Sequence, residues 1–185
     1  MSRTPSTMIP LGTTAPAFTL PNVVNGKATS LEEVKGKKGT LIMFICNHCP
    51  FVIHVNPEIV KLGQEYSEKG ISMVAINSND VSSHPEDSPE KMKEVAAKLG
   101  YVFPYLYDET QDIAKAYDAA CTPDFFLFGE DLKLVYRGQL DGARPGNEIP
   151  VTGKDLRAAM DDLLSGREIS SDQKPSLGCN IKWKV

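Results

Sequence analysis

The stretch that most constrains the fold is residues 41–57, LIMFICNHCPFVIHVNP. Its first five residues, Leu41 to Ile45, are apolar without interruption, so they lack the alternation of a strand that has one face in water. Such a run predicts a strand covered on both faces, in the middle of a parallel or mixed sheet. After Pro50 the apolar positions recur at intervals of three and four, which predicts a helix to about Ser67.

Two cysteines, Cys46 and Cys49, lie where this strand passes into the helix. Unpaired N–H groups and the positive end of the helix dipole favour a thiolate at such a junction. Two intervening residues let one turn bring the sulfurs together, so Cys46 is predicted to attack a disulfide and Cys49 to resolve the mixed intermediate. We expect His48 to stabilise the thiolate by charge or a hydrogen bond, and Asn47 to tune the pair through polar contacts.

A metal site is the alternative interpretation of the same two cysteines. A structural zinc site needs four ligands, and the sequence holds no second C-x-x-C and no H-x3-H. We therefore predict redox chemistry without a metal or cofactor. A metal-binding or copper-delivery module that uses Cys46, Cys49 and one histidine stays open, as does a structural protein with an idle disulfide. The further candidate ligands are His48, His54, His84, Cys121 and Cys179.

Composition limits the partners and the location. A chain of 185 residues predicts one domain that needs no disulfide staples. The net charge of -4 and the absence of a Lys/Arg-rich run argue against nucleic acid or an anionic membrane as the main partner. The sequence shows no stretch long enough to span a membrane and no N-terminal apolar segment of signal length. Four cysteines in such a chain favour redox roles in the cytoplasm over a disulfide framework, and the oligomeric state stays open.

The remaining patterns predict strands that alternate with helices. With crossover connections, this order predicts an α/β sandwich whose central strands are parallel. The polar loop 78–88 then lies at the same end of the sheet as Cys46. The predicted elements are a hairpin around Phe18 and Asn25-Gly26, a helix at 31–34 capped by Thr29 or Ser30, strands at 39–45, 71–77 and 103–107, helices at 50–67, 89–99 and about 112–117, a hairpin at 125–137, and a last helix capped by Thr152.

Three local assignments complete the prediction of secondary structure and surface. Residues 1–10 are expected to be a loose tail. Glu58, on the helix that follows Pro50, is expected to be a solvated charge. The run from Asp108 to Gln111 resembles a capping box for the helix that follows it.

These residues together carry a family pattern. The motif Cys46-x-x-Cys49 after a buried strand, with Thr122-Pro123 before a Phe-rich hairpin, resembles the thioredoxin-like superfamily. The hairpin FFLFGEDLKLVYRG and the opening Gly12-x-x-Ala15-Pro16-x-Phe18-x-Leu20 resemble its peroxiredoxin-related branch, the alkyl hydroperoxide reductase and thiol-specific antioxidant family with the TlpA-type reductases. The resemblance implies a thioredoxin-like three-layer α/β/α domain at residues 9–165, with an N-terminal β-hairpin extension and a C-terminal tail at residues 166–185.

The resemblance also implies an activity and a substrate wall. In this family the proline that matches Pro123 is cis, and its loop packs beside the cysteine pair and binds the substrate backbone, which implies substrate-binding roles for Thr122 and Pro123. The implied enzyme is a thiol–disulfide oxidoreductase that exchanges a Cys46–Cys49 disulfide with a protein or a small thiol and uses an unidentified electron donor.

A peroxidase is the nearest alternative enzyme. It would use Cys49 as the peroxidatic residue, and Cys46, Cys121 or Cys179 as the resolving residue. The peroxiredoxin motif P-x-x-x-T-x-x-C is only partly matched, because Ile42 stands in place of the proline and Cys46 in place of the threonine.

Overall fold

The computed structural model describes residues 3–185, and a five-stranded sheet forms its centre. The middle strand is β4 (Gly39–Phe44), and every one of its residues is buried. The strand order is β6-β5-β4-β8-β9; β4, β5 and β6 are parallel, whereas β8 and β9 form an antiparallel hairpin beside β4. The predicted buried strand and Phe-rich hairpin are both confirmed. The other bounds are β5 (Ile71–Asn77), β6 (Tyr105–Tyr107), β8 (Asp124–Gly129) and β9 (Leu134–Gly138).

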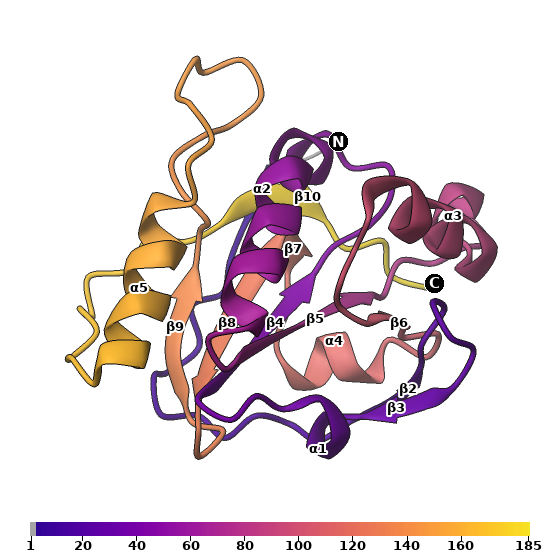
Figure 1. Cartoon of the computed structure of the whole chain (residues 1–185). Coiled ribbons are helices and arrows are strands. Elements are labelled where there is room, and N and C mark those ends of the chain that lie inside the picture. The colour runs from indigo at the N-terminus through magenta and orange to yellow at the C-terminus, as the bar shows by residue number, and fades with distance from the viewer. Residues whose placement is uncertain (1–2) are drawn as a thin grey trace.

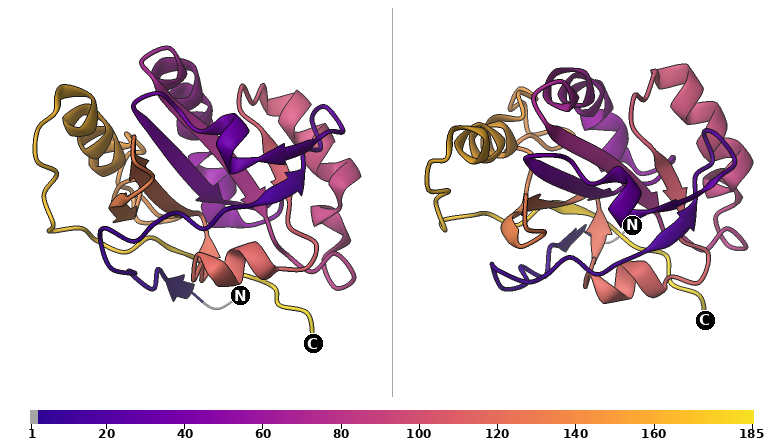
Figure 2. Two further views of the ribbon diagram at one scale, coloured as in Figure 1. Left: turned by 90° about the horizontal axis from the view of Figure 1, so that it is seen from below. Right: turned by 60° about the horizontal axis from the view of Figure 1, so that its bottom comes forward.

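Helices cover both faces of this sheet (Figures 1 and 2). Successive side chains of β4 alternate between two apolar clusters, one containing Leu41 and Met43 and the other Ile42 and Phe44. The first cluster packs against α2 (Pro50–Ser67), α3 (Pro89–Leu99) and α5 (Lys154–Ser165), and the second against α1 (Leu31–Val34) and α4 (Asp112–Ala116). The predicted α/β/α layering is confirmed. Among the helices of residues 3–185, none combines the length and the apolar character that a membrane span requires.

The N-terminal hairpin is also as predicted. Strands β2 (Thr19–Pro21) and β3 (Ala28–Ser30) pair antiparallel and lead directly into α1. Ser30 caps α1 by a reciprocal capping box: its hydroxyl accepts the N–H of Glu33, and the Glu33 carboxylate accepts the N–H of Ser30, both at 3.2 Å.

Two helix starts differ from the prediction. The capping box expected from Asp108 to Gln111 is wrong, because Gln111 is itself the N-cap of α4, at a φ of 68°. Asp108 is fully buried and accepts the N–H of Ala114 at 2.9 Å. It therefore caps the first turn of α4 from a position before the N-cap residue. The N-cap of α5 is Gly153 rather than Thr152. The Thr152 hydroxyl instead accepts the N–H of Lys154, two residues later, at 3.3 Å.

The two ends of the chain form a second sheet that the sequence did not predict. β10 (Leu177–Asn180) lies between β1 (Arg3–Pro5) and β7 (Cys121–Thr122), antiparallel to both (Figure 1). The expected loose segment 1–10 is therefore wrong for β1, whereas residues 1 and 2 lie outside the described residues. The segment 166–185, expected as a tail, begins where α5 ends and returns to the body of the domain.

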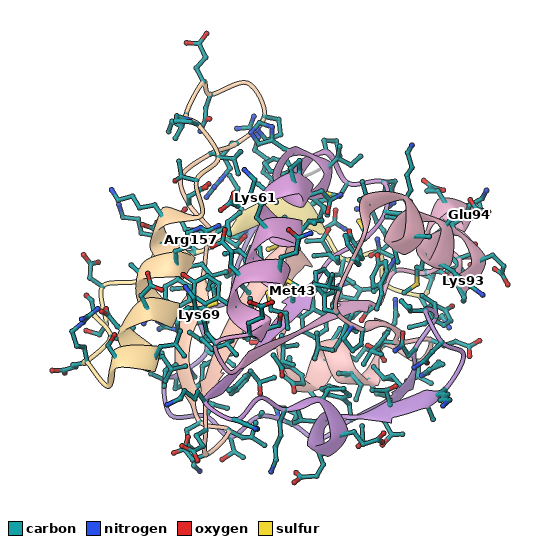
Figure 3. The ribbon with its side chains drawn as sticks, in the orientation of Figure 1. Met43, Lys61, Lys69, Lys93, Glu94 and Arg157 are labelled. Carbon is teal, nitrogen blue, oxygen red and sulfur yellow. A yellow bond between two sulfur atoms is a disulfide. The ribbon has the colours of Figure 1, made fainter. Side chains whose placement is uncertain are left out.

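Glu58 is not the solvated charge that we expected. Its side chain is 7% exposed, and its Oε1 lies 2.7 Å from Nη2 of Arg157 on α5. Arg157 also pairs with Glu65, two turns further along α2. In Figure 3, Arg157 reaches from α5 toward α2. No local pattern indicates this burial, because Glu58 becomes covered only when α5 packs beside α2.

Removing the Arg157 side chain is expected to destabilise the fold. Arg157→Leu leaves the Glu58 carboxylate buried without its cation, so the free energy of unfolding should fall by about 3 kcal/mol. Urea unfolding at pH 7 measures this change. The matched control is Arg167→Leu, whose exposed pair with Asp162 should contribute less than about 1 kcal/mol. Equal effects of the two substitutions would contradict the prediction.

Candidate active site

The two motif cysteines lie at the predicted junction of strand and helix. Cys46 follows the end of β4 by two residues, and Cys49 is the N-cap of α2, with Pro50 at the first helical position. Both side chains are buried, with 2% of Cys46 and 0% of Cys49 exposed. The helix begins at Cys49, three residues after Cys46, and the backbone N–H groups of His48 and Cys49 reach the Cys46 sulfur.

The Thr122–Pro123 loop lies against both sulfurs. The peptide bond between these residues is cis, as the family resemblance implied. The Thr122 hydroxyl is 3.4 Å from Sγ of Cys46, and the Thr122 carbonyl oxygen is 3.4 Å from Sγ of Cys49. The implied contact between loop and cysteines is confirmed, whereas the roles of Thr122 and Pro123 in substrate binding stay predictions.

The disulfide in the structure is not the expected Cys46–Cys49 pair, and it contains Cys179, one of the candidate resolving residues. Cys49 is bonded to Cys179, with a Cα–Cα distance of 6.3 Å, whereas Cys46 is a free thiol. The expected Cys46–Cys49 pair is thus open in this state. Strand β10 is the reason, because it places Cys179 opposite Thr122 in the register of the second sheet. Since 130 positions separate the bonded cysteines, no local spacing could have revealed the pairing.

Cys46 is a weak acid in this environment. Its pKa is raised to about 11, because burial disfavours the thiolate and because the Asp87 carboxylate adds negative charge nearby. The Thr122 hydroxyl and the backbone N–H groups of His48 and Cys49 act in the opposite direction, with smaller effect. An acidic Cys46 thiol, as expected from the sequence, is therefore wrong for this closed state.

Asp87 is the functional residue that sequence reasoning missed. It is fully buried, and its Oδ2 lies 2.6 Å from Nδ1 of His48. It also accepts hydrogen bonds from the Asn47 backbone N–H at 2.7 Å and from the side chains of Asn77 and Asn79 at 3.2 and 3.0 Å. Burial opposes its ionisation, but these hydrogen bonds outweigh that effect and lower the pKa of Asp87. The available signal was the polar loop 78–88, whose predicted position beside Cys46 is confirmed.

His48 and Asn47 are fixed by this loop. The hydrogen bond to Asp87 raises the pKa of His48, and the His48 ring stacks on that of His84 at a centroid distance of 5.1 Å. Asn47 donates through Nδ2 to the Glu86 carbonyl oxygen, and its Oδ1 accepts the Tyr105 hydroxyl, both at 2.9 Å. The polar contacts of Asn47 are thus present, and redox tuning by the two residues stays a prediction.

The ion pair between His48 and Asp87 predicts a specific pH dependence of the free energy of unfolding. Because the pKa of His48 is raised on folding, its contribution is fully present below its unfolded pKa of about 6.5 and is lost as the pH rises through the folded value. The stability difference between the wild type and His48→Asn should therefore shrink between pH 6 and pH 9 in urea unfolding. The same comparison in an Asp87→Asn background should not depend on pH, and a pH-dependent difference there would contradict the assignment.

Cys121 and Asp124 flank Thr122 and Pro123 in the sequence. Cys121 is buried and free; burial raises its pKa, and its Sγ lies 3.6 Å from the Pro123 carbonyl oxygen. A resolving role for Cys121 stays a prediction. Asp124 is fully buried, and burial raises its pKa to about 7, while the Ser6 hydroxyl donates to it at 2.8 Å. The only sequence signal for Asp124 was a carboxylate directly before an apolar strand.

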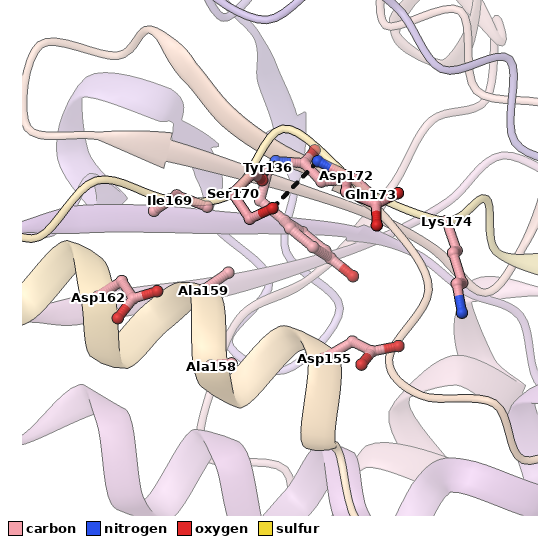
Figure 4. A pocket seen from close by; sticks show the side chains of 10 residues that line it. All are labelled: Tyr136, Asp155, Ala158, Ala159, Asp162, Ile169, Ser170, Asp172, Gln173 and Lys174. Atoms are coloured by element: carbon pink, nitrogen blue, oxygen red, sulfur yellow. Dashed lines mark hydrogen bonds between the residues drawn. The ribbon is translucent and has the colours of Figure 1, made fainter.

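A metal would meet three possible ligands here. One side-chain atom each of Cys46, His48 and Asp87 lies within 4.8 Å of the other two. This set differs from the alternative ligand set of Cys46, Cys49 and one histidine, because Cys49 is bonded to Cys179. A separate pocket between α5 and residues 169–174 contains no cysteine and is not part of this site (Figure 4). Its lining includes Tyr136, Asp155 and Asp162.

The sequence of the chain is similar to those of known proteins. The family model described as Redoxin matches residues 10–156. Over 112 residues the chain is 28% identical to a thiol-disulfide oxidoreductase ResA from Halalkalibacterium halodurans, and the match covers 60% of this chain and 59% of that protein.

Solved structures resemble the whole chain. An uncharacterized conserved protein from Geobacillus kaustophilus is 63% identical, with a TM-score of 0.98 and coverage of 100% of this chain and 97% of that one. A putative thiol:disulfide interchange protein DsbE from Chlorobium tepidum is 20% identical, with a TM-score of 0.67 and coverage of 84% and 99%, and shares the fold. The thioredoxin-like fold expected from the sequence is thereby confirmed.

Proposed function

Because the chain belongs to the Redoxin family, we propose that it is a thiol–disulfide oxidoreductase in which Cys46 and Cys49 exchange with substrate and Cys179 is an internal third partner. One observation carries this proposal: a free thiol, Cys46, and a closed disulfide, Cys49–Cys179, contact the same residue, Thr122. The ResA relatives, which are named for this activity, support it.

The first step is an internal exchange. The Cys46 thiol loses its proton and attacks Sγ of Cys49, the Cys46–Cys49 bond forms, and the Cys49–Cys179 bond breaks. Cys179 leaves as a thiolate and takes up a proton, so the step moves the disulfide without net oxidation. Because the pKa of Cys46 is about 11, the proton needs an acceptor, and the Asp87 carboxylate places an oxygen within 4.8 Å of the Cys46 sulfur.

The second step is exchange with substrate. A substrate thiolate attacks Sγ of Cys46, and Cys49 leaves as a thiolate stabilised at the N-terminus of α2. A second substrate thiol then displaces Cys46, which gives a substrate disulfide and a reduced pair; a disulfide substrate runs the same steps backward. The position of Cys49 at the N-cap is the reason for this order, because the helix N-terminus stabilises the negative charge on the departing sulfur.

Mass spectrometry of thiol pairing tests the proposal. The wild type and the single cysteine-to-serine variants at positions 46, 49 and 179 are equilibrated in defined glutathione mixtures, and their disulfides are mapped. A reversible Cys46–Cys49 disulfide should form, and Cys179→Ser should increase its share. A protein in which Cys46 enters no disulfide at any glutathione ratio would overturn the proposal.

A thiol peroxidase is the second candidate, and the disulfide itself favours it. A Cys49 thiolate at a helix N-terminus would attack a peroxide oxygen, release water or an alcohol, and become a sulfenic acid. Cys179 would then condense with it, losing water and forming the bond present in the structure. Peroxide consumption by the reduced wild type, absent in Cys49→Ser and unaffected by Cys46→Ser, would select this candidate.

The cytoplasmic location stays a prediction.

A further inference from the structure

Strand β10 covers the loop that precedes the cis proline. Cys179 pairs with Thr122 and Asn180 with Cys121 in an antiparallel register, and Figure 1 shows β10 alongside β7. Gly178 lies so close to the loop that an added Cβ would stand 2.0 Å from the Thr122 carbonyl oxygen and 3.2 Å from the Pro123 nitrogen. An extended backbone segment is therefore seated on the surface that we predict to contact substrate.

The same segment carries a disulfide to the active site. Cys179, one residue after the tightly packed glycine, is bonded to Cys49, whose sulfur also lies beside Thr122. An extended strand that is paired with the loop and joined to an active-site cysteine has the form of a mixed disulfide with a bound peptide. Here both partners belong to one chain.

Strand β10 also closes the site. The exposed fractions are 2% for Cys46, 0% for Cys49 and 1% for Cys179, so a sulfur of another protein cannot reach them in this state. Exchange with a protein substrate therefore requires the strand to move away from Thr122.

The segment is anchored on both sides of β10. Before the strand, Gln139 donates its N–H to the Lys174 carbonyl oxygen at 2.9 Å. After it, the Lys182 backbone N–H donates to Oδ1 of Asn79 at 2.9 Å, and the Lys182 carbonyl oxygen accepts the Asp80 N–H at 2.8 Å. Once Cys49–Cys179 is broken, no covalent bond holds the internal segment 175–181 to the site, and its strand pairing with β1 and β7 and the hydrogen bonds of Ser176 must open for it to leave, while Lys174 and Lys182 keep their contacts.

We propose that residues 177–180 occupy the binding site for an extended, cysteine-containing segment of a partner protein, and that opening the Cys49–Cys179 disulfide makes this site available. The proposal rests on the proposed function and specifies a substrate class for it: the partner cysteine takes the place of Cys179 on Cys49, and Cys46 displaces it as in the internal exchange. The partner segment has glycine directly before its cysteine, because the Thr122 carbonyl oxygen leaves no room for a Cβ at that position. It is also uncharged, as Leu177–Asn180 is.

Peptide competition in the full-length Cys46→Ser protein tests the substrate class. The probe is a peptide with the sequence of residues 175–181, PSLGCNI, and the matched control is PSLACNI. Each peptide thiol attacks Cys49, forming a mixed disulfide and releasing Cys179, which takes up the proton. Because residue 46 is serine, the product is not resolved and mass spectrometry can count it.

The glycine peptide should reach half conversion at a thiol concentration at least about 10-fold lower than the alanine peptide, and glutathione should behave like the alanine peptide. Equal conversion by both peptides would overturn the proposal. The glutathione series on the wild type tests the proposed function separately. If that series yields a Cys46–Cys49 disulfide while both peptides convert equally, the proposed function stands and only the inference about the partner segment is rejected.

Hydrogen exchange of the wild type tests the opening. On reduction, the amides of residues 177–180 should exchange at least about 10-fold faster, whereas those of β4 should keep their protection. Unchanged protection of residues 177–180 after complete reduction would show a permanent structural strand and would overturn the proposal.

Discussion

Cys46→Ser should lower thiol–disulfide exchange turnover on the order of 1,000-fold while leaving the Cys49–Cys179 disulfide intact. The reason is that Cys46 is the free thiol beside that disulfide, and a serine hydroxyl is not a nucleophile toward sulfur at neutral pH. Turnover is measured with a dithiol peptide and its disulfide, and the state of the remaining cysteines is mapped by mass spectrometry.

The matched control is Cys121→Ala. Cys121 is also buried and free, but its sulfur contacts the Pro123 carbonyl oxygen rather than the Thr122 hydroxyl that Cys46 contacts. Turnover of this variant should stay within about 2-fold of the wild type, since no exchange step is assigned to Cys121. A comparable loss in both variants would make Cys121 a participant, and full turnover of Cys46→Ser would assign exchange to Cys49 alone.

Loss of the Cys49–Cys179 bond should produce the largest change in stability. The bond joins cysteines 130 positions apart, so it restricts most of the unfolded chain. For a loop of this length, Cys179→Ala should lower the free energy of unfolding by about 4 kcal/mol. Urea unfolding of the wild type and variant, each with and without dithiothreitol, measures the change.

The reductant distinguishes the disulfide from other effects of the substitution. Dithiothreitol should bring the wild type close to Cys179→Ala and change the variant far less, because a disulfide between the neighbouring Cys46 and Cys49 closes only a short loop. Cys46→Ser keeps the bond and should respond to the reductant as the wild type does. If the midpoint of wild-type unfolding is the same with and without dithiothreitol, the bond does not stabilise the fold and the prediction is wrong.

The main elements of the fold could be predicted because their signals are local. The run from Leu41 to Ile45 has no alternation, and burial on both faces of β4 is the physical counterpart of that pattern. The periodicity after Pro50 likewise corresponds to α2, which ends at Ser67 as expected. Helix starts were less predictable, since the buried Asp108 holds α4 through tertiary contacts rather than by a local box.

The candidate site, too, was predictable only where its signals are local. The contact of Cys46 and Cys49 with Thr122 followed from the motif and the family resemblance. The burial of Asp87 did not, because a carboxylate in a polar loop looks solvated until His48, Asn77 and Asn79 converge on it. His48 comes from a segment remote in sequence, and Asn77 and Asn79 lie at the start of the loop that carries Asp87, so their convergence is a property of the folded chain.

The sequence by itself determined the buried strand, the helix after it, and the two cysteines at their junction, because hydrophobic periodicity and turn chemistry act over a few residues. Only the tertiary structure decided which cysteines pair and that burial raises the pKa of the Cys46 thiol. Strand β10 brings Cys179 to Cys49 across 130 positions, and the helix begins at Cys49 rather than Cys46. Disulfide choice and thiol pKa depend on distance, burial and nearby charge, and those quantities exist only once the chain has folded.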